Sequence, residues 1–240
     1  MARLFVSDVH LDAGAPQAIE QFLDFLKVYA HDAEALYILG DLFETWLGDD
    51  DSDPQKARVT SALRELTASG VAVFVIHGNR DFLLGQAFCA RTGCELLTDP
   101  TVVELDGERV LITHGDALCT DDRAYQGLRS CVRAPAWQRR FLALPLVARE
   151  DLAQQARAGS QTHTARARPQ IMDVNAGVVE KAFQAVRVRR MIHGHTHRPA
   201  IHDTSIDGRP AQRIVLGAWY EQGSYLWYER GRYELRELSR

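Results

Sequence analysis

Short apolar runs alternate with helix-like segments through most of the chain, and this alternation limits the folds that it can adopt. The segment 16–30 places Ile19, Phe22 and Leu26 on one face of a helix. Strands are expected at 3–8, 35–41, 71–79, 109–114 and 189–192, and helices at 16–30, 54–69, 81–92 and 174–187. Such a pattern predicts an α/β fold.

Two regions depart from this alternation. Residues 120–170 form a long, mostly helical insertion, and four strand-like runs joined by turn signals follow residue 198. We expect these runs to form an antiparallel sheet from 199–206, 211–218, 223–229 and 232–238. The length of 240 residues predicts a single domain, 1–240, that carries the insertion at about 120–170.

Composition excludes several classes of protein. Hydrophobic residues make up 46% and charged residues 25% of the chain, which excludes a disordered or fibrous protein. The four cysteines form no CxxC zinc pair, and a strand-like segment stands where a secretion signal would lie. No apolar run approaches the roughly 18 residues that cross a bilayer. We therefore expect a cytoplasmic monomer with no nucleic-acid partner.

Polar side chains follow nearly every expected strand, and seven of them have the chemistry of metal ligands. Because ligands bind at the carboxyl ends of strands in open α/β sheets, we expect these residues to converge. Carboxylate, imidazole and amide ligands suit ions such as Mn²⁺, Fe²⁺ or Zn²⁺. Seven ligands exceed the need of one ion. We predict two ions bridged by Asp41, one held by Asp8, His10 and His197, the other by Asn79, His114 and His195.

The stretch HGHTH at 193–197 places three histidines within five positions. On an extended segment alternate side chains point to the same side, so His195 and His197 are expected to face the metals together. A bend at Gly194 would let the backbone come close to them. His193 precedes this bend, and we leave it out of the metal set.

The motifs, in this order, resemble those of the calcineurin-like metallophosphoesterases. Asp-x-His, Gly-Asp, Gly-Asn-x-Asp, His-Gly-Asp and Gly-His-Thr-His cover about residues 4–200. Longer stretches such as HGNRDFLLG, IMDVN and HGHTHRPAIH resemble the branch of this family that hydrolyses UDP-2,3-diacylglucosamine in lipid A biosynthesis. The resemblance implies an αββα sandwich of two mixed sheets, two Mn²⁺ ions with the ligand division given above, and an inserted helical lid over the acyl chains.

The resemblance also implies a reaction. A metal-bridging hydroxide held by Asp41 attacks the UMP-side phosphorus, giving UMP and 2,3-diacylglucosamine 1-phosphate (lipid X). Many relatives in the broad family carry a histidine at position 80, where it protonates an alkoxide leaving group. Here the leaving group is a sugar phosphate whose second pKa is about 6, so it leaves without a proton. Arg80 is instead predicted to hold the pyrophosphate oxygens.

We predict that the substrate is bound by Asn79, Arg80, Asp122, Ser160, Thr164, Arg166 and His195. Asp122 and Ser160 match positions that contact substrate in the family, whereas Thr164 stands where the family often has asparagine. Ala167 stands where relatives commonly place a lysine, so Arg166 or Arg168 is expected to supply that cation. Three carboxylates are candidates for orienting the ligating histidines, with an ordinary polar role as the alternative: Asp12, Glu44 and Asp116.

The first part of the insertion is both basic and apolar. Between residues 123 and 149 it holds six arginines and no acidic residue. Its apolar side chains include Trp137, Phe141, Leu142, Leu144, Leu146 and Val147. We predict an apolar lid with a basic rim, which accepts acyl chains and lies peripherally on the cytoplasmic face of the inner membrane. The alternative is an ordinary amphipathic helical hairpin packed on the core.

Two other functions stay open at this point. One is a phosphodiesterase or pyrophosphatase of the same superfamily that acts on a soluble nucleotide, which activity on UDP-sugars without acyl chains would favour. The other is a non-catalytic interaction scaffold with a calcineurin-like fold. Such a scaffold is expected to have lost metal ligands, whereas this chain keeps all seven.

Overall fold

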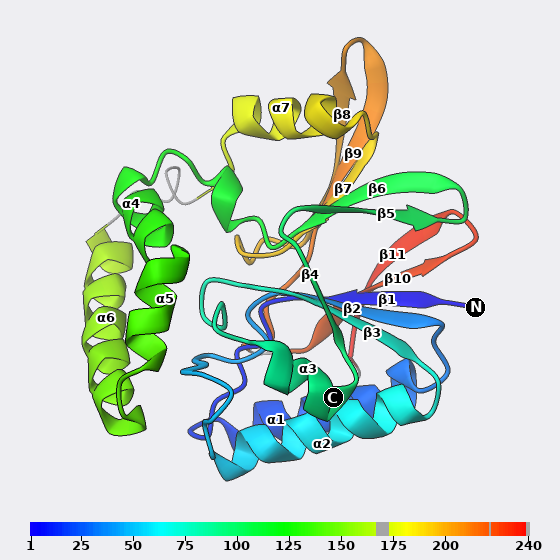
Figure 1. Cartoon of the computed structure of the whole chain (residues 1–240). Helices are drawn as coiled ribbons and strands as arrows, with labels where there is room; N and C mark the ends of the chain where they lie inside the picture. The colour runs from blue at the N-terminus through cyan, green and yellow to red at the C-terminus, as the bar shows by residue number, and fades with distance from the viewer. Residues whose placement is uncertain (167–172, 221, 239–240) are drawn as a thin grey trace.

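Two β-sheets pack face to face in the computed structural model of the chain, which describes residues 1–166, 173–220 and 222–238, with side chains to residue 159 in the first range (Figure 1). The first sheet has the order β11-β10-β1-β2-β3-β4 and the second the order β5-β6-β7-β9-β8. Parallel and antiparallel pairs occur in both. The strands of the first sheet are β1 (Arg3–Val6), β2 (Ala35–Leu39), β3 (Ala72–Ile76), β4 (Glu95–Leu97), β10 (Ser224–Glu229) and β11 (Arg232–Glu237). Those of the second are β5 (Thr101–Leu105), β6 (Glu108–Thr113), β7 (Arg190–His193), β8 (Ala200–Ile206) and β9 (Arg209–Val215).

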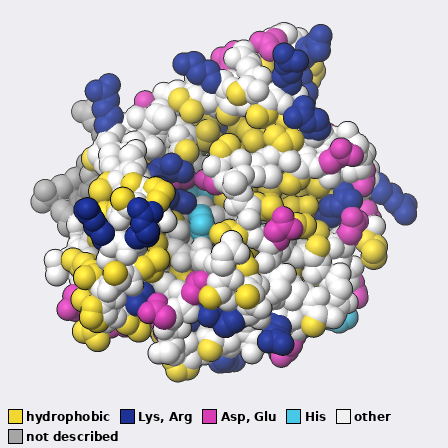
Figure 2. Space-filling model, in the orientation of Figure 1, with side chains coloured by type: hydrophobic (Ala, Val, Ile, Leu, Met, Phe, Trp, Pro, Cys, Tyr) yellow, Lys and Arg dark blue, Asp and Glu magenta, His cyan; other side chains and the backbone are white. Residues whose placement is uncertain are grey.

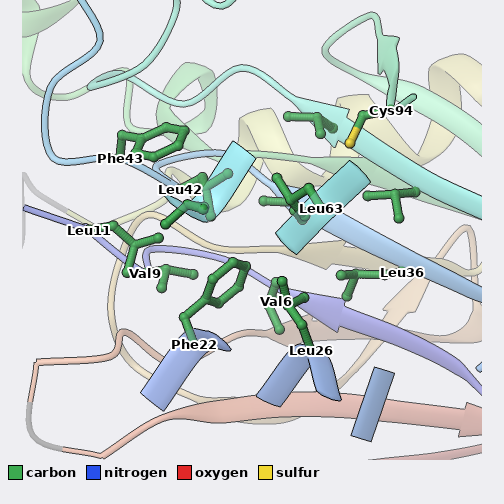
Figure 3. Close-up of a cluster of buried hydrophobic side chains, with 14 of the residues drawn as sticks. Val6, Val9, Leu11, Phe22, Leu26, Leu36, Leu42, Phe43, Leu63 and Cys94 are labelled. Atoms are coloured by element: carbon green, nitrogen blue, oxygen red, sulfur yellow. The ribbon is translucent and has the colours of Figure 1, made fainter. Parts of the chain in front are cut away.

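Alternate residues of the central strands supply two different layers of the core. On β1, Phe5 packs between the sheets, whereas Leu4 and Val6 pack against helices. Figure 3 shows Val6 beside Phe22 and Leu26 in this helical layer. The first sheet is covered by α1 (Pro16–Phe25), its π-helical continuation (Leu26–Ala30), α2 (Pro54–Ala68) and α3 (Gln86–Thr92), and the second by α7 (Ala176–Val186). The predicted αββα sandwich of two mixed sheets is confirmed.

Helix ends follow local chemistry. Helix α2 begins with Pro54 as predicted, and the Asp53 carboxylate caps it by accepting the backbone N–H groups of Gln55 and Lys56. Helix α3 ends at Gly93, whose φ of 75° suits glycine. This helix is shorter than the predicted 81–92, because residues 81–85 form a turn.

The prediction that the four C-terminal strands form one antiparallel sheet is wrong. Strands β8 and β9 form one antiparallel hairpin, and β9 lies parallel to β7 in the second sheet. Strands β10 and β11 form another hairpin, and β10 lies antiparallel to β1 in the first sheet. Each hairpin forms by local pairing, but the strand that it joins is distant in sequence. Strands β4 and β5 were not anticipated either.

The insertion folds into three helices, α4 (Arg123–Val132), α5 (Pro135–Leu142) and α6 (Leu146–Arg166). They stand together beside the carboxyl ends of β1, β2 and β3 (Figure 1). Ala167 and Arg168 lie outside the described residues. Within the described part of the chain, no helix is long and apolar enough to cross a membrane.

Candidate metal centre and adjoining cavity

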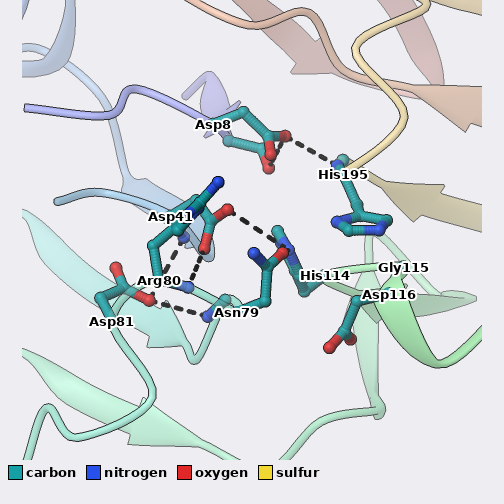
Figure 4. Close-up of polar contacts among 12 residues, drawn as sticks. Asp8, Asp41, Asn79, Arg80, Asp81, His114, Gly115, Asp116 and His195 are labelled. Carbon is teal, nitrogen blue, oxygen red and sulfur yellow. Dashed lines mark hydrogen bonds and ion pairs between the residues drawn. The ribbon is translucent and has the colours of Figure 1, made fainter. Parts of the chain in front are cut away.

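The seven predicted ligands lie in loops at the carboxyl ends of five strands. Asp8 and His10 follow β1, Asp41 follows β2, and Asn79 follows β3. His114 follows β6, and the loop after β7 carries His195 and His197. Figure 4 shows Asp8, Asp41, Asn79, His114 and His195 around one small space. The structure therefore brings together residues that the strand-end pattern alone suggested would meet.

One group of donor atoms comes from Asp8, His10 and His197. The Nε2 atom of His197 lies 3.2 Å from Asp8 Oδ1 and 3.5 Å from His10 Nε2. His10 Nε2 lies 3.9 Å from the same Asp8 oxygen. All three atoms lie within 4.8 Å of one another. An ion that holds its ligands at about 2.1 Å keeps them at separations of this size.

A second group comes from Asp8, Asp41 and His114, whose donor atoms also lie within 4.8 Å of one another. The Nε2 atom of His114 is 3.0 Å from Asn79 Oδ1 and 3.8 Å from Asp41 Oδ2. The same Asp41 oxygen lies 3.9 Å from His10 Nε2. Asp8 belongs to both groups, and the Asp41 carboxylate of the second group also approaches His10 of the first.

The 193–197 segment is not extended, which corrects the sequence expectation. Only His193 belongs to β7, and His195 and His197 have φ values of 67° and 54°. The backbone N–H of His195 donates to Asp8 Oδ2 at 2.8 Å, and its ring centroid lies 5.0 Å from that of His114. The close approach expected at Gly194 is confirmed, because a Cβ atom there would overlap the side chains that begin this loop cluster, Ser7 and Asp8.

Left-handed backbone is concentrated at the predicted ligands. Positive φ values for residues other than glycine are uncommon and cost about 1–3 kcal/mol each. Among the described residues nine show them, and five of these nine are predicted ligands: Asp8, His10, Asp41, His195 and His197. The remaining four lie at turns or at the end of α7. The surrounding hydrogen bonds hold the ligand loops in a conformation that the isolated chain would avoid.

Several groups fix the orientation of these side chains. The buried Asp81 carboxylate accepts the backbone N–H groups of Leu42 and Gly78, both at 2.8 Å, and so joins two ligand loops. His114 Nδ1 donates to the Leu39 carbonyl at 2.9 Å, which leaves Nε2 facing the cluster. His193 is buried outside the cluster, where its Nδ1 donates to the Gly194 carbonyl.

The three carboxylates left open by the sequence have different roles. Glu44 lies 2.7 Å from His10 Nδ1 through its Oε2 atom and so orients a predicted ligand. Asp116 is fully buried and accepts the Tyr125 hydroxyl at 2.6 Å and Arg129 Nε at 2.7 Å. Asp12 accepts the backbone N–H of a loop residue two positions on and orients no histidine among the described contacts.

Burial and mutual charge perturb the whole cluster. Burial raises the pKa of Asp41 to about 6, although His114 and His10 oppose the shift. Burial would lower the pKa of His114, but Asp41, Asp8 and Asp116 raise it to about 9. Burial, and then the charge of His114, lowers the pKa of His195 to about 3. Such opposed shifts among packed groups are typical of functional sites.

The donor set fits a divalent metal ion. Buried carboxylates at this density repel one another unless a cation lies between them. Imidazole, carboxylate and amide donors together suit Mn²⁺, Fe²⁺ or Zn²⁺ better than Ca²⁺. Both donor groups are compact enough to surround an ion. The residues present therefore agree with a metal centre at the carboxyl edge of the sheets.

A cavity of about 620 Å³ adjoins this cluster. Asn79 and Arg80 line it at the metal side. Its apolar wall comes from both the core and the insertion, with Trp46, Leu47, Phe82, Leu83, Leu128, Val132, Trp137, Phe141, Leu144 and Leu152 among the lining residues. Trp137 stacks on Phe141 with ring centroids 4.8 Å apart. Leu142, Leu146 and Val147, also predicted to form the lid surface, are not among the described lining residues.

The six arginines of the insertion do not all form a rim, which corrects the sequence interpretation. Arg129 is bound inward to Asp116, and Arg133 donates to the Gly78 carbonyl at 2.8 Å. Arg149 is 1% exposed. The exposed arginines are Arg123, Arg139 and Arg140. Figure 2 shows basic and apolar side chains side by side on this part of the surface, and a histidine in the hollow beside it.

The remaining predicted substrate contacts divide into two sets. Asp122 is buried and caps α4 by accepting the backbone N–H of Tyr125 at 3.0 Å, and it is not among the described residues that line the cavity. The side chains of Ser160, Thr164 and Arg166 lie outside the described part of α6.

Three residues near the cluster were not singled out from the sequence. Tyr125 lines the cavity, with its ring centroid 5.9 Å from that of His195. Arg157 of α6 lies 3.1 Å from Glu44 and links the insertion to the His10 loop. Tyr220 stacks on His10 at 5.2 Å. Of these three, only Tyr125 could have been found from the sequence, because it lies one helical turn after the predicted substrate contact Asp122.

The family model of the calcineurin-like phosphoesterases matches residues 1–199. The chain belongs to this family. The prediction made from the strand-end motifs is thus confirmed, and this phosphoesterase-family enzyme has the metal dependence of its family. An archaeal phosphodiesterase has a similar fold, with a TM-score of 0.52 at 14% identity over 99% of this chain and 100% of that one.

Two relatives with similar sequences have one name in common. The UDP-2,3-diacylglucosamine hydrolase of Salmonella arizonae is 50% identical over 224 residues, which are 93% of each chain. That of Aeromonas hydrophila is 49% identical over 237 residues, 99% of this chain and 98% of the other. The likeness includes the insertion as well as the ligand loops.

Proposed function

We propose that the enzyme hydrolyses the pyrophosphate bond of UDP-2,3-diacylglucosamine by attack of water on the UMP-side phosphorus, giving UMP and 2,3-diacylglucosamine 1-phosphate in lipid A biosynthesis. The observation that carries this proposal is an apolar cavity of about 620 Å³ that shares Asn79 and Arg80 with the ligand cluster. A soluble nucleotide has no acyl chain to bury against such an apolar wall. The names of relatives about 50% identical support the same substrate.

We further propose two Mn²⁺ ions as cofactors, bridged by Asp41. Asp8, His10 and His197 would hold one ion, and Asn79, His114 and His195 the other. When bound, the ions supply an activated water and neutralise charge on the phosphoryl group. The place of Asp41 Oδ2, 3.9 Å from His10 Nε2 and 3.8 Å from His114 Nε2, supports the bridging role.

Arg80 is proposed to bind the pyrophosphate. Its side chain lines the cavity and is partly exposed, and its Nη1 atom is 3.9 Å from Glu44 Oε1. Its backbone N–H donates to Asp41 Oδ1 at 2.8 Å, so the residue is fixed relative to the metal ligands. A guanidinium offers paired donors to phosphate oxygens but no transferable proton near neutral pH.

The whole chain is proposed to form one metallophosphoesterase domain, active as a monomer, with α4–α6 as a lid over the acyl chains. Five of the nine large apolar side chains that are exposed in the described chain belong to this lid: Leu128, Leu142, Leu144, Val147 and Leu152. With the exposed Arg139 and Arg140 beside them, they support peripheral binding to the cytoplasmic face of the inner membrane.

A turnover assay tests substrate and metal together. We expect rapid hydrolysis of UDP-2,3-diacylglucosamine with Mn²⁺, no hydrolysis with chelator, and little hydrolysis of UDP-GlcNAc. Equal rates on both substrates would favour a pyrophosphatase of soluble nucleotides. Absence of any turnover in the metal-loaded protein would leave an interaction scaffold as the better description.

A further inference from the structure

One buried cation of the insertion has no part in the reaction proposed above. Arg149, in the first turn of α6, is the largest fully buried side chain among the described residues. Its Nε atom donates to the Leu144 carbonyl at 3.1 Å, and Nη1 donates to the Leu47 carbonyl. Both Nη atoms also pair with the Asp50 carboxylate. One side chain thus joins the insertion to a core loop.

The two carbonyls belong to residues that line the apolar cavity from different parts of the chain. Leu47 lines it from the core, and Leu144 lines it from the segment between α5 and α6. One guanidinium therefore ties together the backbones of two residues that line the cavity. Elsewhere the insertion is held by α4, where Arg129 and Tyr125 bind the buried Asp116, and by α6, where Arg157 pairs with Glu44.

Local preferences do not explain a buried arginine at this position. A cation in the first turn of a helix opposes the helix dipole, and burial of its charge costs free energy that an ion pair seldom repays in full. Gly48 makes room for it, because a Cβ atom at this φ of 136° would meet the Arg149 guanidinium. Buried polar or charged groups that add little stability are retained in some proteins because they fix one geometry.

We propose that Arg149 is a positioning residue that fixes the width of the cavity between Leu47 and Leu144 and thereby sets the acyl-chain length that the enzyme prefers. The inference rests on the proposed function. A chain that fits gains about fourfold in affinity for each buried CH₂ group. A longer chain must separate two lining residues that one side chain holds together by hydrogen bonds.

Arg149→Met tests this inference, because methionine keeps an unbranched apolar stem and removes every donor. We would measure kcat/KM for UDP-diacylglucosamines with chains from ten to sixteen carbons. Wild type and the control Arg139→Met, which changes an exposed arginine of α5, should share one sharp optimum. In Arg149→Met the preference for the optimum over a chain four carbons longer should fall at least tenfold. Hydrolysis of a small chromogenic phosphodiester should stay within twofold of wild type.

A purely structural role would lower kcat/KM by the same factor at every chain length, and that result would overturn the inference. Asp50→Asn provides a second variant if Arg149→Met folds poorly, since the Asp50 side chain is 64% exposed and its change leaves the carbonyl contacts in place. It should flatten the profile in the same direction by about threefold, and an unchanged profile there would also contradict the inference. Failure of the wild type on every diacylated substrate would contradict the proposed function itself.

Discussion

The cluster of predicted metal ligands, called the floor below, differs in construction from the inserted helices α4–α6, the proposed lid. The floor consists of side chains from five loops, most of them buried, with five predicted ligands in left-handed backbone. The lid is one continuous stretch of helices, and several of its apolar side chains are exposed. Because many hydrogen bonds are needed to hold the loops of the floor in a strained conformation, few substitutions in them should be tolerated. If the insertion acts as the proposed lid, its attachment at a few points such as Asp116 and Asp50 would allow substrate preference to change without disturbing the metal centre.

The largest effect should follow a change in the floor. Asp41→Ala removes the carboxylate that is proposed to bridge the two ions, so we expect loss of both ions and a fall in activity of at least about 1,000-fold, or about 4 kcal/mol. His197→Ala belongs to one group only and should weaken mainly one ion. Metal content of the purified variants, measured by elemental analysis, decides between them. Two ions bound to Asp41→Ala would disprove the bridging role.

A change at the boundary between floor and lid should cost less. Arg80→Ala removes a charge-assisted contact to the pyrophosphate, and we expect about a 100-fold loss of kcat/KM with the metal content unchanged. Arg80→His tests the chemistry of the position. If the sugar phosphate leaves without a proton, histidine should not restore the rate. Recovery to near wild type would show that position 80 acts as an acid.

The two regions also differ in how far the sequence predicts them. The floor was predictable because ligands gather at strand ends, and this rule needs only the order of strands and helices. The left-handed conformations of Asp8, His10 and Asp41 were not, since they arise from contacts such as those of Asp81 with two loops. The extended conformation assumed for 193–197 failed for the same reason.

In the lid, the helices were predictable but their attachments were not. Arg149 pairs with a residue 99 positions away, and no periodicity or spacing reveals such a partner. The composition of the insertion therefore suggested a basic rim, although half of its six arginines between residues 123 and 149 are bound inward. The partners of the two C-terminal hairpins were equally hidden, because alternation of apolar residues marks a strand but not the sheet that it joins.

The inner surface of the lid gives the next prediction. Phe141→Ser or Leu144→Ser places a hydroxyl in the apolar wall, and we expect at least a tenfold fall in kcat/KM for the diacylated substrate, since each buried CH₂ group contributes about 0.8 kcal/mol. Leu142→Ser is a matched control, because Leu142 adjoins Phe141 but is 41% exposed and is not among the described lining residues.

The ratio of two activities separates lid from floor in these variants. A small chromogenic phosphodiester needs the metal centre but no acyl site, so its hydrolysis should stay within twofold of wild type. A parallel fall in both activities, at unchanged thermal stability and metal content, would mean that these side chains support the floor. The lipid-lid interpretation would then be withdrawn.

The outer surface of the lid should give the smallest effect. Val147 is 68% exposed and is not among the described residues that line the cavity, and its side chain would enter the membrane interface if the lid binds there. Partial burial of this side chain contributes on the order of 1 kcal/mol, so Val147→Ser should weaken binding to anionic vesicles about fivefold. Turnover of detergent-dispersed substrate should change by less than twofold. Val28→Ser, a control at an equally exposed valine beside α1, should leave vesicle binding unchanged. Equal losses in the control and the lid variant would mean that the lid makes no specific contact with the membrane, and that its exposed side chains serve only the acyl site beneath them.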